Sequence, residues 1–329
     1  MWNETIPEEI RKQIDENTYG LAMASFGGIP LKREFDNEDF CVVGIPYDTC
    51  TSRRAGARFG PRAIRAGVHS IAGINEKGIY SQDAHYVIRN LKGMDYGNIP
   101  VKNGYTEISF QVIYEHMKNI LDHGCTPIAL GGDHSITYPE LRAYAESAGK
   151  PVAIIHFDSH NDTTDTPENR KFTHGTPFRR AFEDGFLDAA HSIQIGIRGY
   201  MDSHRLKFAE ENGMEVITAR ELHKMSPEEC AERIRAQVKD APCIVTFDVD
   251  FLDPVYTPGT GTPVAGGFTS YEAYELVRQG LTGLDIRGFD IVEVTEDYDP
   301  AQITGLFAGY LVVQFLVVLS KNKAEKEGK

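Results

Sequence analysis

Short apolar runs rich in β-branched residues alternate along the chain with longer segments in which apolar residues recur at helical spacing. The short runs predict strands at Phe40–Ile45, Pro127–Leu130, Val152–Phe157, Ser192–Ile197, Glu215–Thr218, Cys243–Phe247 and Phe289–Val294. The longer segments predict helices at Glu107–His123, Pro139–Ala148, Ser203–Asn212, Pro227–Val238, Tyr271–Leu281 and Thr304–Leu319. Alternation of this kind indicates an α/β fold in which helices cover both faces of a mainly parallel sheet.

No Pro/Ser-rich linker and no shift of composition divides the chain, so the pattern predicts a single domain over residues 1–329. Only the polar ends, Met1–Glu16 and Lys321–Lys329, are expected to be peripheral tails. The most apolar stretch, Gly305–Leu319, is short for a membrane span and contains Gln314. It therefore predicts a buried helix in place of a membrane span. Because Met1–Glu16 is polar and acidic, it is not expected to be a secretory signal.

Composition and charge narrow the class of protein. A chain with 41% hydrophobic and 25% charged residues can bury a full core, which argues against a disordered protein. The formal net charge of -14 disfavours nucleic-acid binding, because contact with phosphates requires a basic face. The five cysteines include no C-x-x-C pair, and their odd number favours reduced thiols in a cytoplasmic protein over a disulfide framework.

Three of the predicted strands run directly into acidic residues and histidines. These segments are Ile128-Ala-Leu-Gly-Gly-Asp-His-Ser135, Ala153-Ile-Ile-His-Phe-Asp-Ser-His-Asn-Asp162 and Ile244-Val-Thr-Phe-Asp-Val-Asp-Phe-Leu-Asp-Pro254. Because alternate side chains of a strand face the same side, Asp158, His160 and Asp162 are expected to point together. Asp248 and Asp250 repeat the arrangement. One aspartate alone is readily explained as a helix or turn cap, whereas the joint pattern is not.

Carboxylates gathered at a strand end repel one another unless a cation lies between them. Four aspartates and two imidazoles therefore predict two divalent cations. His134 follows Gly131-Gly132, where the backbone can turn sharply, and is the expected sixth ligand beside His160. Asp133 is expected to orient its neighbours by hydrogen bonds. Carboxylate and imidazole ligands suit Mn²⁺ without excluding other first-row metals.

The motifs Gly-Gly-Asp-His-Ser, Asp-x-His-x-Asp and Asp-x-Asp-x-x-Asp-Pro, in this order, resemble those of the ureohydrolase (arginase/agmatinase) family, in its agmatinase-like branch. The resemblance extends from Gly44-Ile-Pro-Tyr-Asp48 and Gly56-Ala-Arg-Phe-Gly-Pro61 to Glu293. It implies a three-layer α/β/α domain with a doubly wound, mainly parallel sheet and two Mn²⁺ per subunit, with Ni²⁺ as the alternative. One ion would be held by His134, Asp158, Asp162 and Asp248, and the other by His160, Asp158, Asp248 and Asp250.

The resemblance also implies a reaction. A water between two cations becomes a hydroxide near neutral pH, and it would attack the carbon of a guanidinium group. Asp162 would pass on the proton of this nucleophile, and His174 matches the histidine proposed as the family's proton shuttle. Glu293 matches the glutamate that binds the guanidinium group. The alternatives are a loop histidine without a catalytic role and a solvated strand-end glutamate.

The implied substrate is a small guanidino compound that is split into urea and an amine, with agmatine and putrescine as the favoured pair. The loop after Asp162 lacks the Asn/Ser-rich pattern of arginases. Its acids Asp165 and Glu168 suit an amine. The carboxylate of guanidinobutyrate or guanidinopropionate would need a positive partner, for which the candidates are Arg53, Arg54, Arg170 and Lys171. Departures such as Thr295-Glu296-Asp297 leave guanidine and biguanide-type compounds such as metformin open, which relatives hydrolyse with nickel.

Two other classes of function compete with this interpretation. A catalytically silent subunit of a hetero-oligomer would keep the fold, although silent relatives usually lose some of the ligands that are present here. A formiminoglutamase or a deacetylase-like enzyme would release formamide or acetate in place of urea. By resemblance alone the protein is expected to be a homo-oligomer, a trimer or a hexamer.

Overall fold

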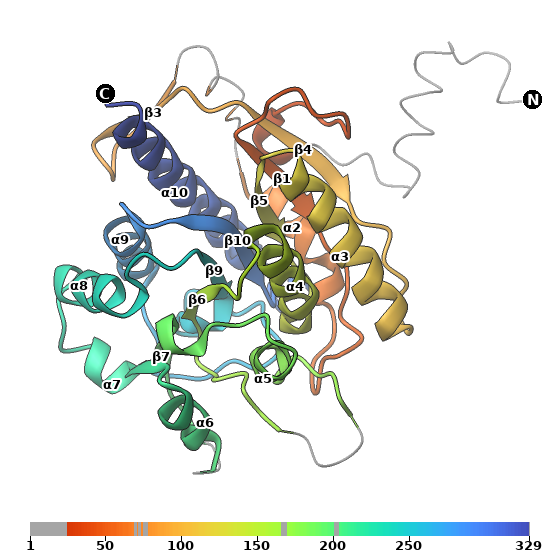
Figure 1. The fold of residues 1–329 in the computed structure, drawn as a ribbon, viewed down its shortest axis with the longest axis vertical. Helices are drawn as coiled ribbons and strands as arrows, with labels where there is room; N and C mark the ends of the chain where they lie inside the picture. The colour runs from red at the N-terminus through yellow and green to blue at the C-terminus, as the bar shows by residue number, and fades with distance from the viewer. Residues whose placement is uncertain are drawn as a thin grey trace, which may run out of the picture.

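The computed structural model describes residues 25–68, 71, 74, 78–165, 170–200 and 204–328. Its centre is an eight-stranded sheet in the order β4-β1-β5-β10-β9-β6-β7-β8, in which neighbouring strands are parallel (Figure 1). These strands are β1 (Phe40–Gly44), β4 (Gly93–Asn98), β5 (Thr126–Leu130), β6 (Ala153–Phe157), β7 (Ile193–Ile197), β8 (Glu215–Thr218), β9 (Cys243–Asp248) and β10 (Ile286–Val292). A separate antiparallel pair consists of β2 (Ile79–Ser81) and β3 (Tyr86–Ile88).

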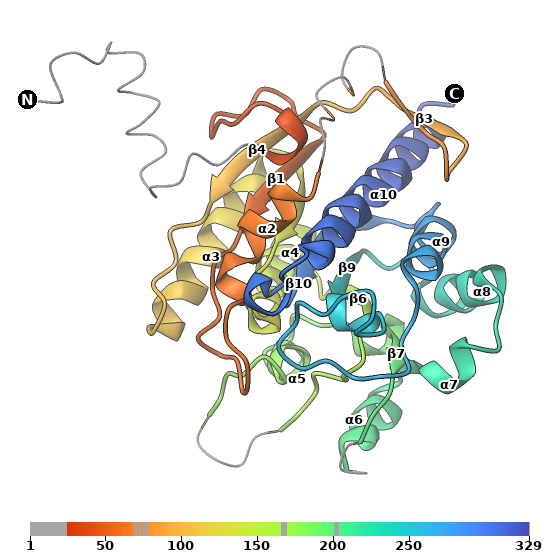
Figure 2. The same ribbon diagram turned by 180° about the vertical axis from the view of Figure 1, so that it is seen from behind.

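Helices cover both faces of the sheet, which confirms the predicted three-layer α/β/α fold (Figures 1 and 2). The helices on one face are α3 (Thr106–Asp122), α4 (Thr137–Ala148), α5 (Pro177–Glu183) and α6 (His204–Asn212). Those on the other face are α2 (Gly60–Ala66), α7 (Ala219–Leu222), α8 (Pro227–Val238), α9 (Ser270–Leu281) and α10 (Ile303–Lys326).

Successive residues of the central strands point into two different cores. Ile155 and Phe157 of β6 lie in the core beside α8, α9 and α10, whereas Ile154 lies in the core beside α3 and α4. Strands of a parallel sheet are buried on both faces in this way. On the α3–α4 side, buried polar residues replace apolar ones in a group that we term the polar layer: His156, Gln194, Thr246 and Asp290.

The edge strand β4 is not predicted by the hydrophobic pattern, because two glycines, an aspartate and an asparagine give its sequence a low strand propensity. Its pairing depends on distant residues. Asp95 of β4 accepts hydrogen bonds from the buried guanidinium of Arg65, from Nε at 2.8 Å and from Nη2 at 2.8 Å. By contrast, the helix at Pro227–Val238 is confirmed with its predicted bounds.

Helix α10 continues past Leu319 to Lys326, so the prediction of a peripheral tail from residue 321 is wrong for this part of the chain. Asn322 is buried, and its side chain accepts a hydrogen bond from the Gly283 N–H at 2.8 Å. Among the described residues, α10 is the one helix long and apolar enough to cross a membrane, but 78% of its apolar window is buried inside the protein. The other predicted tail, residues 1–16, lies outside the described residues.

Candidate metal centre

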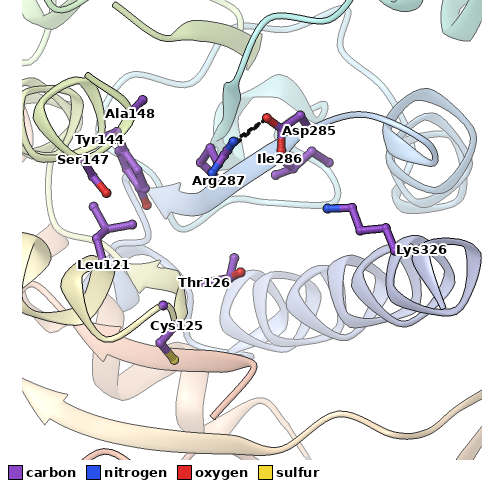
Figure 3. Close-up of a pocket in the computed structure, with 11 residues that line it drawn as sticks. Leu121, Cys125, Thr126, Tyr144, Ser147, Ala148, Asp285, Ile286, Arg287 and Lys326 are labelled. Carbon is purple, nitrogen blue, oxygen red and sulfur yellow. Dashed lines mark hydrogen bonds and ion pairs between the residues drawn. The ribbon is translucent and has the colours of Figure 1, made fainter. Parts of the chain in front are cut away.

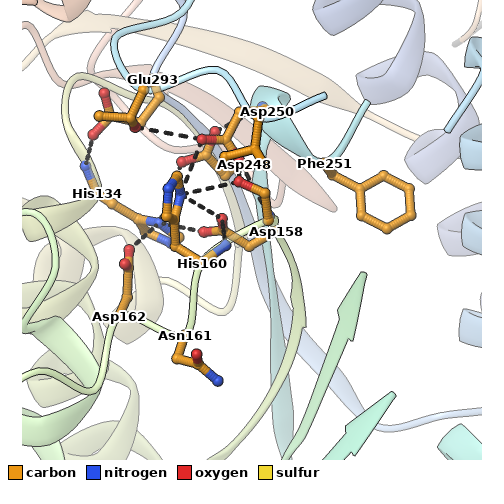
Figure 4. A network of polar contacts seen from close by, with 12 residues as sticks. His134, Asp158, His160, Asn161, Asp162, Asp248, Asp250, Phe251 and Glu293 are labelled. Carbon is orange, nitrogen blue, oxygen red and sulfur yellow. Dashed lines mark hydrogen bonds and ion pairs between the residues drawn. The ribbon is translucent and has the colours of Figure 1, made fainter. Parts of the chain in front are cut away.

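Four consecutive strands at the middle of the sheet, β5, β10, β9 and β6, deliver acidic residues and histidines to one edge. The six predicted ligands follow or end three of these strands: His134 after β5, Asp158, His160 and Asp162 after β6, and Asp248 and Asp250 at the end of β9. The carboxyl ends of parallel strands meet at one edge of a sheet. The six side chains therefore gather in one cluster (Figure 4).

The imidazole of His134 faces three carboxylates. Its Nδ1 lies 3.1 Å from Asp158 Oδ2, 2.9 Å from Asp162 Oδ2 and 3.6 Å from Asp248 Oδ2. Nδ1 is buried and has no hydrogen-bond partner. Burial lowers the pKa of His134, but the three carboxylates raise this pKa more, to well above its ordinary value. A positive charge between the ring and the carboxylates is therefore strongly favoured.

A second group surrounds His160, whose Nδ1 lies 3.4 Å from Asp158 Oδ1 and 3.1 Å from Asp250 Oδ2. Asp158 thus turns one oxygen toward each imidazole, which is the arrangement of a carboxylate shared by two cations. Burial, followed by repulsion from Asp250 and Asp158, raises the pKa of Asp248 well above its ordinary value. Oxygen and imidazole donors at this charge density fit two divalent first-row cations.

The polar layer fixes the proton on His134. The hydroxyl of Thr246 donates its single hydrogen to Asp290 Oδ1 at 2.7 Å, so its oxygen can only accept from His134 Nε2, which is 2.8 Å away. Nε2 therefore carries a hydrogen. The lone pair of a neutral His134 is then on Nδ1, the atom that faces the carboxylates.

His156 also lies within reach of this group, with His134, Asp158 and Asp162. The amide of Gln194 donates to His156 Nδ1 at 3.0 Å, so Nε2 carries the hydrogen that is donated to Asp158 Oδ2 at 2.8 Å. Both ring nitrogens are thus occupied. His156 therefore orients Asp158, and Asp248 Oδ2 lies 3.6 Å from His134 Nδ1 on the same side of the cluster.

Glu293 follows β10 and connects the cluster to His174. Its Oε1 accepts from the backbone N–H of His134 at 2.9 Å and lies 3.0 Å from His174 Nδ1. Its Oε2 is buried and has no hydrogen-bond partner. Burial lowers the pKa of His174, but the charge and hydrogen bond of Glu293 raise this pKa more, to about 9. Glu293 is 1% exposed, so the solvated strand-end alternative is wrong.

A family model described as the arginase family matches residues 38–318. This chain belongs to the arginase family. The match covers every residue of the cluster, and it confirms the resemblance that the three sequence motifs indicate.

Several curated proteins of the arginase family are similar over most of this chain. The mitochondrial agmatinase of Gallus gallus is 40% identical over 300 residues, which cover 91% of this chain and 86% of that protein. The mitochondrial guanidino acid hydrolase of Rattus norvegicus is 39% identical over 304 residues, covering 92% and 84%. The agmatinase of Edwardsiella ictaluri is 38% identical over 307 residues, covering 92% and 96%.

Solved structures show the same arginase-family fold. A hypothetical agmatinase from Burkholderia thailandensis superposes with a TM-score of 0.82 at 36% identity, covering 93% of each chain. Proclavaminate amidino hydrolase from Streptomyces clavuligerus superposes with a TM-score of 0.80 at 34% identity, covering 92% of this chain and 98% of that one.

The sequence pattern predicts that strand alternation brings the ligands together. In the structure, a loop does so instead. Strand β6 ends at Phe157, and Asp158, His160 and Asp162 lie in the loop after it. The backbone of this loop turns, and Asp162 has a φ of 52°. Glu293 also has a left-handed backbone, with a φ of 64°. Such conformations are costly for residues other than glycine, and they concentrate at functional sites.

Of the two remaining predicted substrate-binding residues, Asp165 is engaged in ion pairs. Asp165 is exposed, and its carboxylate pairs with Arg180 at 2.8 Å and with Arg179 at 3.7 Å. Arg170 is exposed and follows residues 166–169, which are outside the described residues. The motifs did not single out Ser52, although its hydroxyl lies 2.7 Å from His174 Nε2. Only a contact across 122 positions of the sequence reveals this partner.

A cavity of about 200 Å³ lies at the opposite end of the strands, where β5 and β10 begin (Figure 3). Its wall includes Cys125, Thr126 and Arg287, and Arg287 is paired with Asp285 at 2.7 Å. None of the six clustered ligands lines this cavity. The cavity is therefore separate from the candidate metal centre.

Proposed function

We propose that this chain hydrolyses a guanidino compound to urea and an amine at a centre of two divalent cations, with agmatine as substrate and putrescine as product. The similarity to agmatinases of two organisms over more than nine-tenths of this chain supports the proposal. The carrying observation is structural. A buried carboxylate with one free oxygen contacts the ring of His174 and the backbone N–H of His134, beside the clustered aspartates.

That free oxygen is Glu293 Oε2. A guanidinium group is planar and donates parallel hydrogen bonds, and a buried carboxylate is its natural acceptor. Gly261 keeps the space open, since a Cβ at this position would lie 3.4 Å from Glu293 Oε2 and 2.9 Å from the carbonyl of Arg54. We therefore assign the guanidinium group to the space between Glu293 and Gly261.

His134, Asp158, Asp162 and Asp248 would hold one cation, and His160, Asp158, Asp248 and Asp250 the other. Bound there, two divalent cations lower the pKa of water to near neutral and so supply a hydroxide nucleophile.

Two side chains around the cluster are placed to accept or donate protons during the reaction. Asp162 is placed to accept the proton of the attacking water, because its Oδ2 lies at the cluster, 2.9 Å from His134 Nδ1. His174 is placed to protonate the leaving amine, because its ring contacts Glu293, the group assigned to the guanidinium. Departure of an amine requires a proton donor, and histidine is suited to this role.

A guanidino acid is the second candidate substrate, since the rat guanidino acid hydrolase is as similar to this chain as the agmatinases. Arg53 is exposed and follows Ser52, which contacts His174. The backbone of Arg54 lies beside Gly261. One arginine next to Ser52 and one whose backbone lies beside Gly261 would favour a carboxylate, whereas Asp165 is already paired with arginines.

Mn²⁺ is our proposed metal, with Ni²⁺ as the alternative, because both accept carboxylate and imidazole ligands. We also propose that residues 1–329 act as one ureohydrolase domain in a cytoplasmic homo-oligomer, a trimer or a hexamer. The cytoplasmic placement is supported by five cysteines that are all free and buried.

The proposal is tested with the purified full chain, stripped with a chelator and reloaded with Mn²⁺ or Ni²⁺. Urea release is measured with agmatine, guanidinobutyrate, guanidinopropionate, arginine and guanidine. We expect the highest kcat/KM with agmatine and equal amounts of urea and putrescine. A higher kcat/KM with guanidinobutyrate would select the guanidino acid alternative. Formamide as product, or no urea from the chain alone, would contradict the proposal.

A further inference from the structure

The loop after β1 holds both the backbone and the ring of His174. The backbone N–H of His174 donates to the carbonyl of Cys50 at 3.1 Å. At the ring, Nε2 lies 3.2 Å from the backbone nitrogen of Ser52 and 2.7 Å from its hydroxyl oxygen. The loop therefore fixes the position and the rotation of the imidazole.

The two ring nitrogens of His174 face different surroundings. Nδ1 lies 3.0 Å from the buried Oε1 of Glu293, whereas Nε2 meets Ser52, which is exposed. Because a backbone N–H can only donate, Nε2 accepts from Ser52 when the ring is neutral, and Nδ1–H then donates to Glu293. The basic nitrogen of the neutral ring is thus the one at Ser52.

We propose that Ser52 is a positioning residue for His174 and that its hydroxyl carries protons between His174 Nε2 and solvent. This inference rests on the proposed function, in which His174 protonates the leaving amine. The Ser52 hydroxyl matters most when the His174 ring is charged. Once Nε2 is protonated it cannot accept from the Ser52 N–H, so the hydroxyl oxygen is its acceptor.

The proton transfer balances without a further reactant. The proton given to the leaving amine is the one on Nε2 of the charged ring, so Nε2 is left with a lone pair. The Ser52 hydroxyl then donates its hydrogen to Nε2 and takes one from a water cluster or a buffer acid. Only N–H and O–H bonds are exchanged. One proton taken up in this way equals the one that the attacking water releases, so hydrolysis consumes no proton overall.

The charges around His174 favour its protonated form. Glu293 is in contact, and Asp162 and Asp133 add attraction from further away. Together they outweigh burial and raise the pKa of His174 to about 9. Removal of the Ser52 hydroxyl would remove the acceptor for Nε2–H and leave these carboxylates unchanged. The pKa of His174 should then fall.

The test compares Ser52→Ala, Ser52→Thr and a control, Thr49→Ala. Thr49 is an exposed residue of the same loop, and its hydroxyl contacts Asn103 and the Gly104 N–H instead of His174. Urea release is followed over pH at increasing imidazole concentration. We expect Ser52→Ala to lower kcat about tenfold with KM within about twofold, a part of the general acid–base contribution. Imidazole should restore the rate, and Ser52→Thr and Thr49→Ala should behave as wild type.

A second measurement does not depend on activity. In chelator-treated protein labelled with ¹⁵N-histidine, the His174 signals are assigned with His174→Asn and titrated. We expect Ser52→Ala to lower the pKa of His174 by about one unit, the size of one hydrogen bond to a charged group. An unchanged pKa, or an unchanged pH profile without imidazole rescue, would overturn the inference. If the wild-type protein released no urea, only the proposed function would be refuted. The titration would still show whether the Ser52 hydroxyl stabilises the charged ring of His174.

Discussion

Two buried threonines donate to the same carboxylate, and only one of them also touches the metal cluster. Thr246 donates to Asp290 Oδ1 at 2.7 Å and Thr137 to Asp290 Oδ2 at 2.9 Å. Both residues are fully buried. Thr246 alone is in contact with His134, at 2.8 Å. Comparing variants of the two threonines therefore distinguishes the effect of orienting a metal ligand from the effect of losing a buried hydrogen bond.

We predict that Thr246→Val weakens binding of the cation at His134 by about 10–100-fold, the usual effect of losing a residue that orients a metal ligand. Thr137→Val should leave metal affinity within about twofold. Both variants should lose about 1–2 kcal/mol of unfolding free energy, since each removes a buried hydrogen bond. Chelator competition and urea denaturation measure the two quantities. Equal metal affinities in the two variants would contradict the assignment.

Glu293 offers a second prediction at the scale of one atom. Glu293→Gln should lower kcat/KM for guanidino substrates on the order of 10–100-fold, because a hydrogen bond to a charged group contributes about 1.5–3 kcal/mol. Metal content should stay at two ions, since Glu293 is not among the proposed ligands. The control is Glu296→Gln. Glu296 lies three positions after Glu293 in the sequence, and its carboxylate pairs with Arg62. Wild-type kinetics in Glu293→Gln would exclude it as the guanidinium anchor.

At the scale of elements, one arginine connects two segments of the site. The Nη2 of Arg198 contacts carbonyl oxygens of Asp250 at 2.6 Å, Leu252 at 3.1 Å and Val264 at 2.8 Å. The first two belong to the turn that carries a proposed ligand. Val264 ends the segment that contains Gly261, at the proposed guanidinium position. Arg198 therefore connects the turn that carries Asp250 to the segment that contains Gly261.

We predict that Arg198→Lys weakens metal binding and raises KM together, because an ammonium group cannot reach these carbonyls in one plane. Each effect should be about tenfold or more, and the unfolding free energy should fall by about 1–3 kcal/mol. The control, Arg233→Lys, alters an arginine that pairs with Glu215. Titration of metal binding and steady-state kinetics provide the measurements. A change in KM without a change in metal affinity would show that Arg198 supports only one side.

The sequence predicts the elements that have a strong hydrophobic period and fails where pairing is non-local. Seven strands of the main sheet are predicted from their apolar runs. The inner strands are buried on both faces, whereas the edge strand β8 is only partly buried. Strand β4 has no such run, and the buried Arg65–Asp95 ion pair holds it from another part of the chain. Local propensity cannot reveal a partner that is 30 residues away.

The same limit applies to the site. The ligands are predicted because clustered carboxylates after strands demand cations, and the structure brings all six together. The supports are not predicted, since Thr246 and His156 look like ordinary strand residues in the sequence. Their roles follow from hydrogen bonds to Asp290 and Gln194, which adjacent strands place beside them. The prediction for Asp165 depends on its charge alone, whereas its pairing with arginines is a tertiary contact.

At the scale of the whole molecule, the buried aspartates tie stability to pH and metal. Burial raises the pKa of Asp248 and of Asp250, and it raises the pKa of Asp133 to about 7. For a carboxyl group whose folded pKa is raised, the stabilisation is complete below the unfolded pKa and is lost as pH rises through the folded pKa. The hydrogen bonds and charges around Asp158 lower its pKa and act in the opposite direction.

We therefore predict that the chelator-treated protein loses unfolding free energy between about pH 4 and about pH 7, by up to about 1.4 kcal/mol per pH unit for each raised group. Added Mn²⁺ should flatten this dependence, because cations bind the ionised carboxylates of the folded state. Asp248→Asn should make the chelator-treated protein more stable at neutral pH and remove the gain from Mn²⁺. Urea denaturation across this pH range, with and without Mn²⁺, measures both.

Asp253 provides the control, because it lies near Asp250 in the sequence and its pKa is shifted in the opposite direction to that of Asp248. Burial raises its pKa, but hydrogen bonds from the backbone N–H groups of Val255, Gly266 and Gly267 lower this pKa more. Its stabilisation is present above the unfolded pKa and is lost as pH falls. Asp253→Asn should therefore destabilise the protein at neutral pH and keep its response to Mn²⁺. If Asp248→Asn behaved like Asp253→Asn, repulsion within the cluster would not be what the cations relieve.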